Sequence, residues 1–125
     1  MEYHIEIEEH ANQKMVHVYI SGTLSDTERF NIGVEIVRKC KENNINKVIF
    51  DIREADLGYS LLGSHQAVQS LSDLGMTKDQ YGAVIYFHNK EQLEHAYTVA
   101  INRGIHNVGF FQNIEEGIKW LASKG

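Results

Sequence analysis

Three short, mostly apolar runs constrain the fold of this chain most strongly. They cover 47–52, 83–87 and 108–111, and none of them alternates between polar and apolar positions. Strands that are covered on both faces have this pattern, because neither face meets water. Apolar residues at helical spacing fill the intervals at 60–74 and 90–103. This order of elements predicts an α/β fold with a mostly parallel sheet, right-handed crossovers and helices on both faces.

The N-terminal segment has a different pattern, because apolar and polar residues alternate over 3–9 and again over 16–20. A period of two is typical of strands with one buried face. The short polar link between the two segments favours a hairpin, so we expect two antiparallel strands at one edge of the sheet. The alternation places His4 and His17 on the outside.

Helix starts are marked by a polar cap followed three positions later by an acid or an amide, as in a capping box. We expect four helices, of which the first buries Phe30, Gly33, Val34, Ile36, Val37 and Cys40 and ends near Asn43 and Asn44. Gly104 is expected to close the third helix. The cap pairs are Ser25 with Glu28, Asn89 with Gln92, and Asn113 with Glu116, and Ser60 stands at the start of the second helix.

Composition narrows the class of protein. A chain of 125 residues fits one domain, 1–125, and a formal net charge of −5 argues against binding to nucleic acid, which needs clustered Lys and Arg. The acidic, alternating start differs from a secretory signal, and the sequence has no long apolar run. One cysteine cannot form an internal disulfide, so we expect a cytoplasmic protein.

The candidate binding surface is the stretch 51–64, because ligands and partners of open α/β sheets meet the loops beyond the carboxyl ends of the strands. Asp51 is the one acid within its apolar strand, so we expect it to be hydrogen-bonded, and an ion pair with Arg53 is the favoured partner. Ser60 can cap the second helix or accept a phosphoryl group. The candidate residues are Asp51, Arg53, Asp56, Tyr59, Ser60, Ser64 and His88, the last of which follows the fourth strand.

We find no catalytic constellation in the sequence, since no pair of a nucleophile and a base can be identified. Asp51, His88 and Ser60 are the reactive groups left for an enzyme hypothesis. The seven histidines lack the helical spacings of metal sites, and the glycines do not form a nucleotide-binding loop. We therefore expect no metal, no cofactor and no enzymatic activity.

Several segments together resemble the SpoIIAA-like branch of the STAS domain family. They are the N-terminal hairpin, ISGTLSDTE before the first helix, VIFDIREADL, and the closing FFQNIEEGIKWL, so the likeness covers nearly the whole chain. The resemblance implies a single STAS-like domain with four helices around the sheet. In the sporulation anti-anti-sigma factors of this superfamily, the second serine of an Asp-Ser-Ser-Gly-type motif is phosphorylated. Here Ser60 matches the first serine and Leu61 the second.

The resemblance implies a non-enzymatic regulatory or protein-interaction module, with Ser60 as the candidate phosphosite. The alternative is a carrier of a small apolar, lipid-like ligand, because the fold is similar to SEC14-like lipid-carrying domains. Aromatic residues such as Tyr86 and Tyr97 could line the pocket that this alternative requires. The expected partners are thus a protein or an apolar ligand, and a peripheral membrane contact and a homodimer are also kept open.

Overall fold

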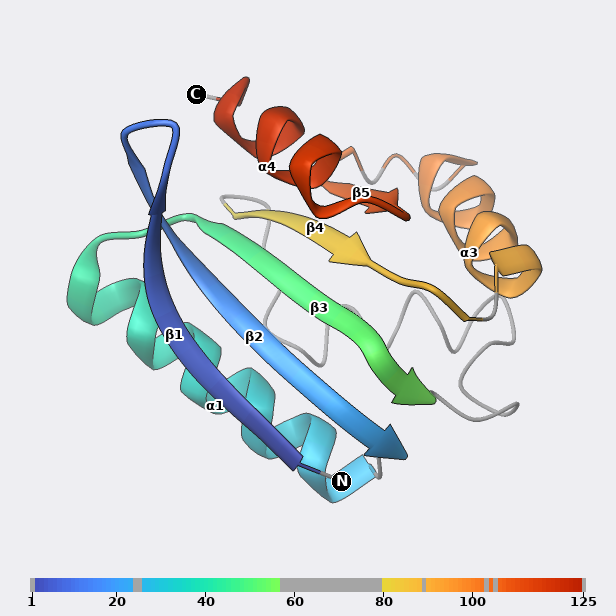
Figure 1. The fold of residues 1–125 in the computed structure, drawn as a ribbon, viewed down its shortest axis with the longest axis horizontal. Coiled ribbons are helices and arrows are strands. Elements are labelled where there is room, and N and C mark those ends of the chain that lie inside the picture. Colours follow the sequence, from blue (N-terminus) through green and yellow to red (C-terminus); the bar gives the residue numbers. More distant parts are fainter. Residues whose placement is uncertain are drawn as a thin grey trace.

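The computed structural model describes residues 2–23, 26–56, 80–88, 90–102, 104 and 106–124. These residues form a mixed α/β fold in which one sheet carries helices on both faces (Figure 1). The elements in chain order are β1 (Glu2–His10), β2 (Gln13–Thr23), α1 (Asp26–Asn43), β3 (Lys47–Asp56), β4 (Tyr81–Ile85), α3 (Lys90–Asn102), β5 (Val108–Phe111) and α4 (Ile114–Ala122).

The strands form a five-stranded sheet in the order β1-β2-β3-β4-β5. β1 is antiparallel to β2, whereas β2, β3, β4 and β5 run parallel to one another. The carboxyl ends of these four strands therefore lie at the same edge of the sheet (Figure 1). The predicted parallel core with a hairpin at one side is confirmed.

A tight turn joins β1 to β2. Its two residues, Ala11 and Asn12, have φ angles of 52° and 63°, in the left-handed region. Two such residues in succession match the twist of a hairpin and fix its register. In that register Glu6 lies opposite His17 and His4 lies opposite Tyr19.

The sheet buries a different apolar cluster on each face. On one face Val18, Phe50 and Val84 pack with side chains of α1 and α3, such as Ile36 and Leu93. The other face carries α4. There Leu121 packs with Met15, Ile49, Ala83 and Ile85. Helices on both faces explain why β3 and β4 have no polar alternation at their centres.

At two positions of α1, the burial of the side chain differs from the prediction. Gly33, Ile36 and Cys40 are buried as expected, but Val34 is 54% exposed, and the fully buried Ile32 was not predicted. Ile32 and Ile36 are four residues apart and share one face, whereas Val34 points away from it. The helix ends at Asn43 as predicted, and Asn44 follows with a φ of 54°.

The ends of the later helices agree with their sequence signals where the structure describes them. Asn113 caps α4, because its Oδ1 accepts hydrogen bonds from the backbone N–H groups of Glu115 at 2.8 Å and Glu116 at 3.3 Å. After α3, Gly104 has a φ of 79°, and its N–H donates to the carbonyl of Ile101. The predicted caps Ser25 and Asn89 lie outside the described residues.

β3 is longer than predicted. The expected strand ends at residue 52, but β3 continues to Asp56, because Glu54, Ala55 and Asp56 pair with the end of β2 beyond an irregularity between Tyr19 and Ser21. Asp51 lies in the strand as expected, but Arg53 also belongs to the strand and not to the loop that was expected to follow it, which corrects the sequence analysis. The predicted second helix at 60–74 lies outside the described residues. None of the helices in the described ranges is both long and apolar enough to cross a membrane.

Candidate functional site

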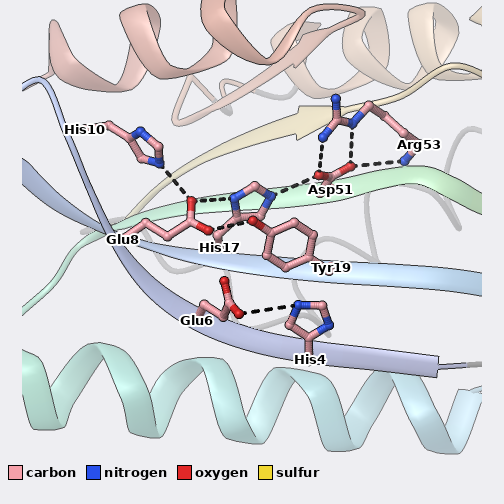
Figure 2. Close-up of polar contacts among 8 residues, drawn as sticks. All are labelled: His4, Glu6, Glu8, His10, His17, Tyr19, Asp51 and Arg53. Carbon is pink, nitrogen blue, oxygen red and sulfur yellow. Dashed lines mark hydrogen bonds and ion pairs between the residues drawn. The ribbon is translucent and has the colours of Figure 1, made fainter.

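The α4 face of the sheet carries a buried histidine, His17, beside the area that α4 covers. Alternation along the hairpin predicted that His17 lies outside, and this prediction is wrong, because only 2% of the residue is exposed. The hairpin register brings Glu8 of β1 to one side of the ring, and β3 brings Asp51 to the other (Figure 2). His4, also predicted outside, is exposed.

Both ring nitrogens of His17 meet a carboxylate. Nδ1 lies 2.8 Å from Glu8 Oε1, and Nε2 lies 3.0 Å from Asp51 Oδ2. Burial alone would lower the pKa of His17, but the hydrogen bonds to Asp51 and Glu8 outweigh it and the pKa is raised. The ring is thus stabilised as an imidazolium that donates to both acids.

Glu8 accepts three hydrogen bonds. Besides His17, the Tyr19 hydroxyl donates to Glu8 Oε2 at 2.5 Å, and His10 Nε2 lies 2.8 Å from Glu8 Oε1. Partial burial opposes ionisation of Glu8, but the hydrogen bonds from Tyr19, His10 and His17 lower its pKa to about 2. Tyr19 also stacks on His17, with ring centroids 3.8 Å apart.

Asp51 connects His17 to a cation. Arg53 donates from Nε to Asp51 Oδ1 at 2.8 Å and from Nη2 to Asp51 Oδ2 at 2.7 Å, which is the two-pronged geometry of a strong ion pair. Burial would raise the pKa of Asp51, but the hydrogen bonds from Arg53 and His17 hold it well below its usual range. The predicted ion pair and the predicted hydrogen bonding of Asp51 are both confirmed.

The five residues form one connected series from β1 across β2 to β3 (Figure 2). We call it the polar chain; its members are His10, Glu8, His17, Asp51 and Arg53. Acidic and basic groups alternate along it, so each carboxylate lies between cationic or hydrogen-bonding neighbours. Buried charges are tolerated when they are paired in this way.

The polar chain ends at an open hollow near the carboxyl edge of the sheet. The Arg53 guanidinium carbon lies 5.6 Å from the centroid of the Phe87 ring, and Phe87 is 56% exposed. A cation over an aromatic face at this distance is attracted by the ring. The hollow has a volume of about 860 Å³ and is called the edge hollow below. Its lining residues are Glu2, Tyr3, His4, Tyr19, Ile20, Ser21, Asp51, Arg53, Glu54 and Phe87.

Solved structures with the same architecture identify the fold. An uncharacterized protein of the DUF3478 family from Shewanella loihica PV-4, described as having a SpoIIAA-like fold, is 20% identical over 95% of this chain and 93% of its own, with a TM-score of 0.63. The chain has a SpoIIAA-like fold. An anti-sigma factor antagonist from Mycobacterium paratuberculosis is 11% identical over 98% of this chain and 96% of its own, with a TM-score of 0.61. No protein-family model matches the sequence, and no curated protein matches it.

Within the SpoIIAA-like fold, the predicted site residues do not all lie together. Asp51 and Arg53 lie together in β3 and line the edge hollow. His88 follows β4 at the same edge and is exposed, but it is not among the residues that line the hollow. Asp56 ends β3. Tyr59, Ser60 and Ser64 lie outside the described residues.

Most of the polar chain was not predicted from the sequence. Glu8 and His17 were assigned to the polar, solvent-facing side of an alternating hairpin, and His10 was considered only as one of seven histidines without metal-site spacing. The signal was present, because Glu8 and His10 share one face of β1, and a two-residue turn places His17 diagonally across from Glu8. Phe87, the most exposed aromatic residue at the rim, was grouped with the core.

Proposed function

We propose that this chain is a non-enzymatic STAS-type regulatory module that binds a protein partner at the edge hollow. The observation that carries the proposal is the pair formed by Arg53 and the exposed Phe87 at the rim of the hollow. Arginine and aromatic side chains dominate the binding energy of protein interfaces. The hollow is also formed by the strand ends where partners of open α/β sheets dock.

Arg53 is held in place before any partner arrives. Its two hydrogen bonds to Asp51 fix the guanidinium, and Asp51 is itself held by His17. A partner therefore does not have to immobilise a flexible arginine, and the entropy cost of association is smaller. Part of the Arg53 side chain, 29%, remains exposed for contact.

The fold comparison supports a regulatory role. One structural neighbour is described as an anti-sigma factor antagonist, and a protein of that kind acts on another protein. Asp56 ends β3, and the predicted stretch with Tyr59, Ser60 and Ser64 follows it in the sequence, so we include these residues in the proposed surface, with Ser60 as the candidate phosphosite. His88, exposed next to Phe87, is included for the same reason.

The chemistry of Asp51 supports a non-enzymatic role. The carboxylate is buried, and its oxygens are engaged by Arg53 and His17. Its lowered pKa means that it holds no proton to donate at neutral pH. Asp51, one of the three groups on which the enzyme hypothesis depended, is thus committed to the polar chain.

A polar partner fits the edge hollow better than the lipid-like ligand of the alternative hypothesis. Asp51, Arg53 and Glu54 line the hollow together with His4, and an apolar ligand would strip water from these groups without replacing their hydrogen bonds. We therefore rank a protein partner first. The single domain 1–125, a cytoplasmic location, a homodimer and a peripheral membrane contact remain predictions.

Site-specific photo-crosslinking in cells of the source organism tests the proposal. A photoreactive residue replaces Glu54, which is exposed and lines the hollow, or Val34, which is exposed on α1. We expect a discrete protein adduct from position 54 that is lost when Phe87→Ser is introduced, and no equivalent adduct from position 34. Phe87 is exposed, so the substitution leaves the core intact.

Two results would contradict the proposal. The first is an adduct from position 54 that persists unchanged in the Phe87→Ser background. The second is a native mass spectrum of protein purified from the same cells that carries a small apolar ligand, combined with no adduct from position 54, which would favour the carrier hypothesis.

A further inference from the structure

Three side chains of the β1–β2 hairpin bring metal-binding atoms together. Glu8 Oε1 lies 2.8 Å from His10 Nε2 and 2.8 Å from His17 Nδ1, and the ligand atoms of the three residues all lie within 4.8 Å of one another. Two imidazoles and one carboxylate are a common protein ligand set for zinc and for related first-row transition metals. The hairpin register alone produces this cluster.

The distances between the ligand atoms are close to those around a bound ion. Ligand atoms at about 2.0–2.1 Å from a tetrahedral zinc ion are roughly 3.3 Å apart. On binding an ion, each of the two 2.8 Å contacts would lengthen by about half an ångström. This is roughly the difference between a hydrogen-bond distance and the distance between two ligand atoms of one metal ion. Rotation of the partly exposed side chains of His10 and Glu8 can supply that movement without a change in the sheet.

Two further residues orient these ligands. Asp51 Oδ2 lies 3.0 Å from His17 Nε2, so Nε2 keeps its proton and Nδ1 is the nitrogen left to bind an ion. The Tyr19 hydroxyl donates to Glu8 Oε2, which leaves Oε1 facing the two histidines. Carboxylate–histidine pairs of this kind are the usual outer support of a metal site.

We propose that Glu8, His10 and His17 form a binding site for a divalent first-row transition-metal ion of the zinc class, supported by Asp51 and Tyr19. The ion would replace the protons that now lie between Glu8 Oε1 and the two ring nitrogens. Three protein ligands leave a fourth position for water. The side chains of His10 and Glu8 are 28% and 22% exposed, so an ion can enter from the His10 side.

This site differs from the sequence expectation of no metal, which considered helical spacings alone. The ligands stand on antiparallel strands, where i and i+2 on one strand and a diagonal position on the next share a face. An ion there would tie the hairpin together and, through His17 and Asp51, fix Arg53 at the edge hollow.

Zinc binding to the full chain tests the inference. Protein stripped with EDTA is titrated with Zn²⁺ in competition with a chromophoric chelator, and Co²⁺ serves as a second probe whose visible absorption reports the coordination geometry. We expect one equivalent of Zn²⁺ per chain and a low-coordinate Co²⁺ spectrum. His10→Gln should weaken the affinity at least tenfold, and Asp51→Asn about 10- to 100-fold.

His95→Gln is the matched control, since His95 is exposed on α3, away from the hairpin. This variant should bind Zn²⁺ like the parent chain. Because His10 lies near the end of β1 and is partly exposed, His10→Gln should fold normally, which circular dichroism checks. The inference is overturned if the parent chain binds no Zn²⁺ at micromolar concentrations, or if His10→Gln and His95→Gln bind equally well.

Discussion

His17 lies on β2 with each of its ring nitrogens facing a carboxylate, and this arrangement makes the stability of the fold depend on pH. The folded pKa of Glu8, about 2, lies below its ordinary value of 4.5, so its contribution is complete above pH 4.5. As the pH falls from 4.5 towards 2, about 3 kcal/mol of the free energy of unfolding should be lost. Asp51, whose pKa is also lowered, adds to this loss in the same direction.

The pKa of His17 is shifted the other way. Because it is raised above 6.5, the stabilisation from the charged ring is complete below pH 6.5 and is lost as the pH rises through the folded pKa. Urea unfolding of the EDTA-treated protein across this range measures both effects. We expect the Glu8→Gln variant to show a shallower acid loss; an unchanged acid slope would contradict the account of Glu8.

Removing Asp51 should destabilise the fold more than removing any exposed acid. Asp51→Asn leaves the buried His17 with one carboxylate, Glu8, instead of two and removes the negative charge that pairs with Arg53, and breaking a buried pair in this way costs about 3–5 kcal/mol. Chemical denaturation at pH 6 measures the change. Glu9→Gln, at an exposed position of β1, is the control and should change the free energy of unfolding by less than about 0.5 kcal/mol.

At the residue scale, the sequence predicts contacts between neighbours but not between strands. Asp51 and Arg53 are two positions apart on one face of a strand, so their ion pair could be predicted. Glu8, His17 and Asp51 meet only because β2 lies between β1 and β3. The alternation in the hairpin placed His17 on the polar face of its strand. The polarity of that face does not reveal that His17 is buried there.

α4 packs on the sheet through a glycine, and this contact makes a prediction at the scale of elements. A Cβ atom at Gly117 would lie 2.5 Å from Cδ1 of the fully buried Ile85. Alanine would gain about 1 kcal/mol from helix propensity, but overpacking a buried site costs about 1–3 kcal/mol. We expect Gly117→Ala to lower the free energy of unfolding by about 1 kcal/mol.

A double-mutant cycle separates the clash from other causes. Ile85→Val removes the Cδ1 atom that the new methyl group would meet. Alone it should cost about 0.5–1.5 kcal/mol, as usual for this change in a core, whereas in the Gly117→Ala background it should cost nothing or restore stability. Additive losses measured by thermal and urea unfolding would show that α4 does not pack as described.

The element order could be predicted because each element has a local signal. Continuous apolar runs identified β3, β4 and β5, and Asn113 marked the start of α4. The full length of β3 could not be predicted, because the end of the strand, from Arg53 to Asp56, is mostly polar. Its polar side chains Arg53 and Glu54 line the edge hollow. Pairing with the end of β2 holds this segment extended.

At the scale of the whole molecule, the polar chain joins the edge hairpin to the carboxyl edge of the parallel strands (Figure 2). His10, on β1, and Arg53, on β3, lie at its two ends. A change at the hairpin, such as loss of the Glu8 carboxylate or binding of an ion, would therefore reach Arg53 at the hollow through His17 and Asp51. The topology of the SpoIIAA-like fold could be predicted from the sequence, but this link could not, because it depends on three strands at once.

A charged His17 holds this link together, because its two ring nitrogens meet the carboxylates on either side of it. Long-range ¹H–¹⁵N NMR of the EDTA-treated chain reports the protonation of each ring nitrogen directly. At pH 6.5 we expect more than half of the His17 rings to carry protons on both Nδ1 and Nε2, with a titration midpoint above 6.5. A midpoint at or below 6.5, with a neutral ring at that pH, would contradict this prediction.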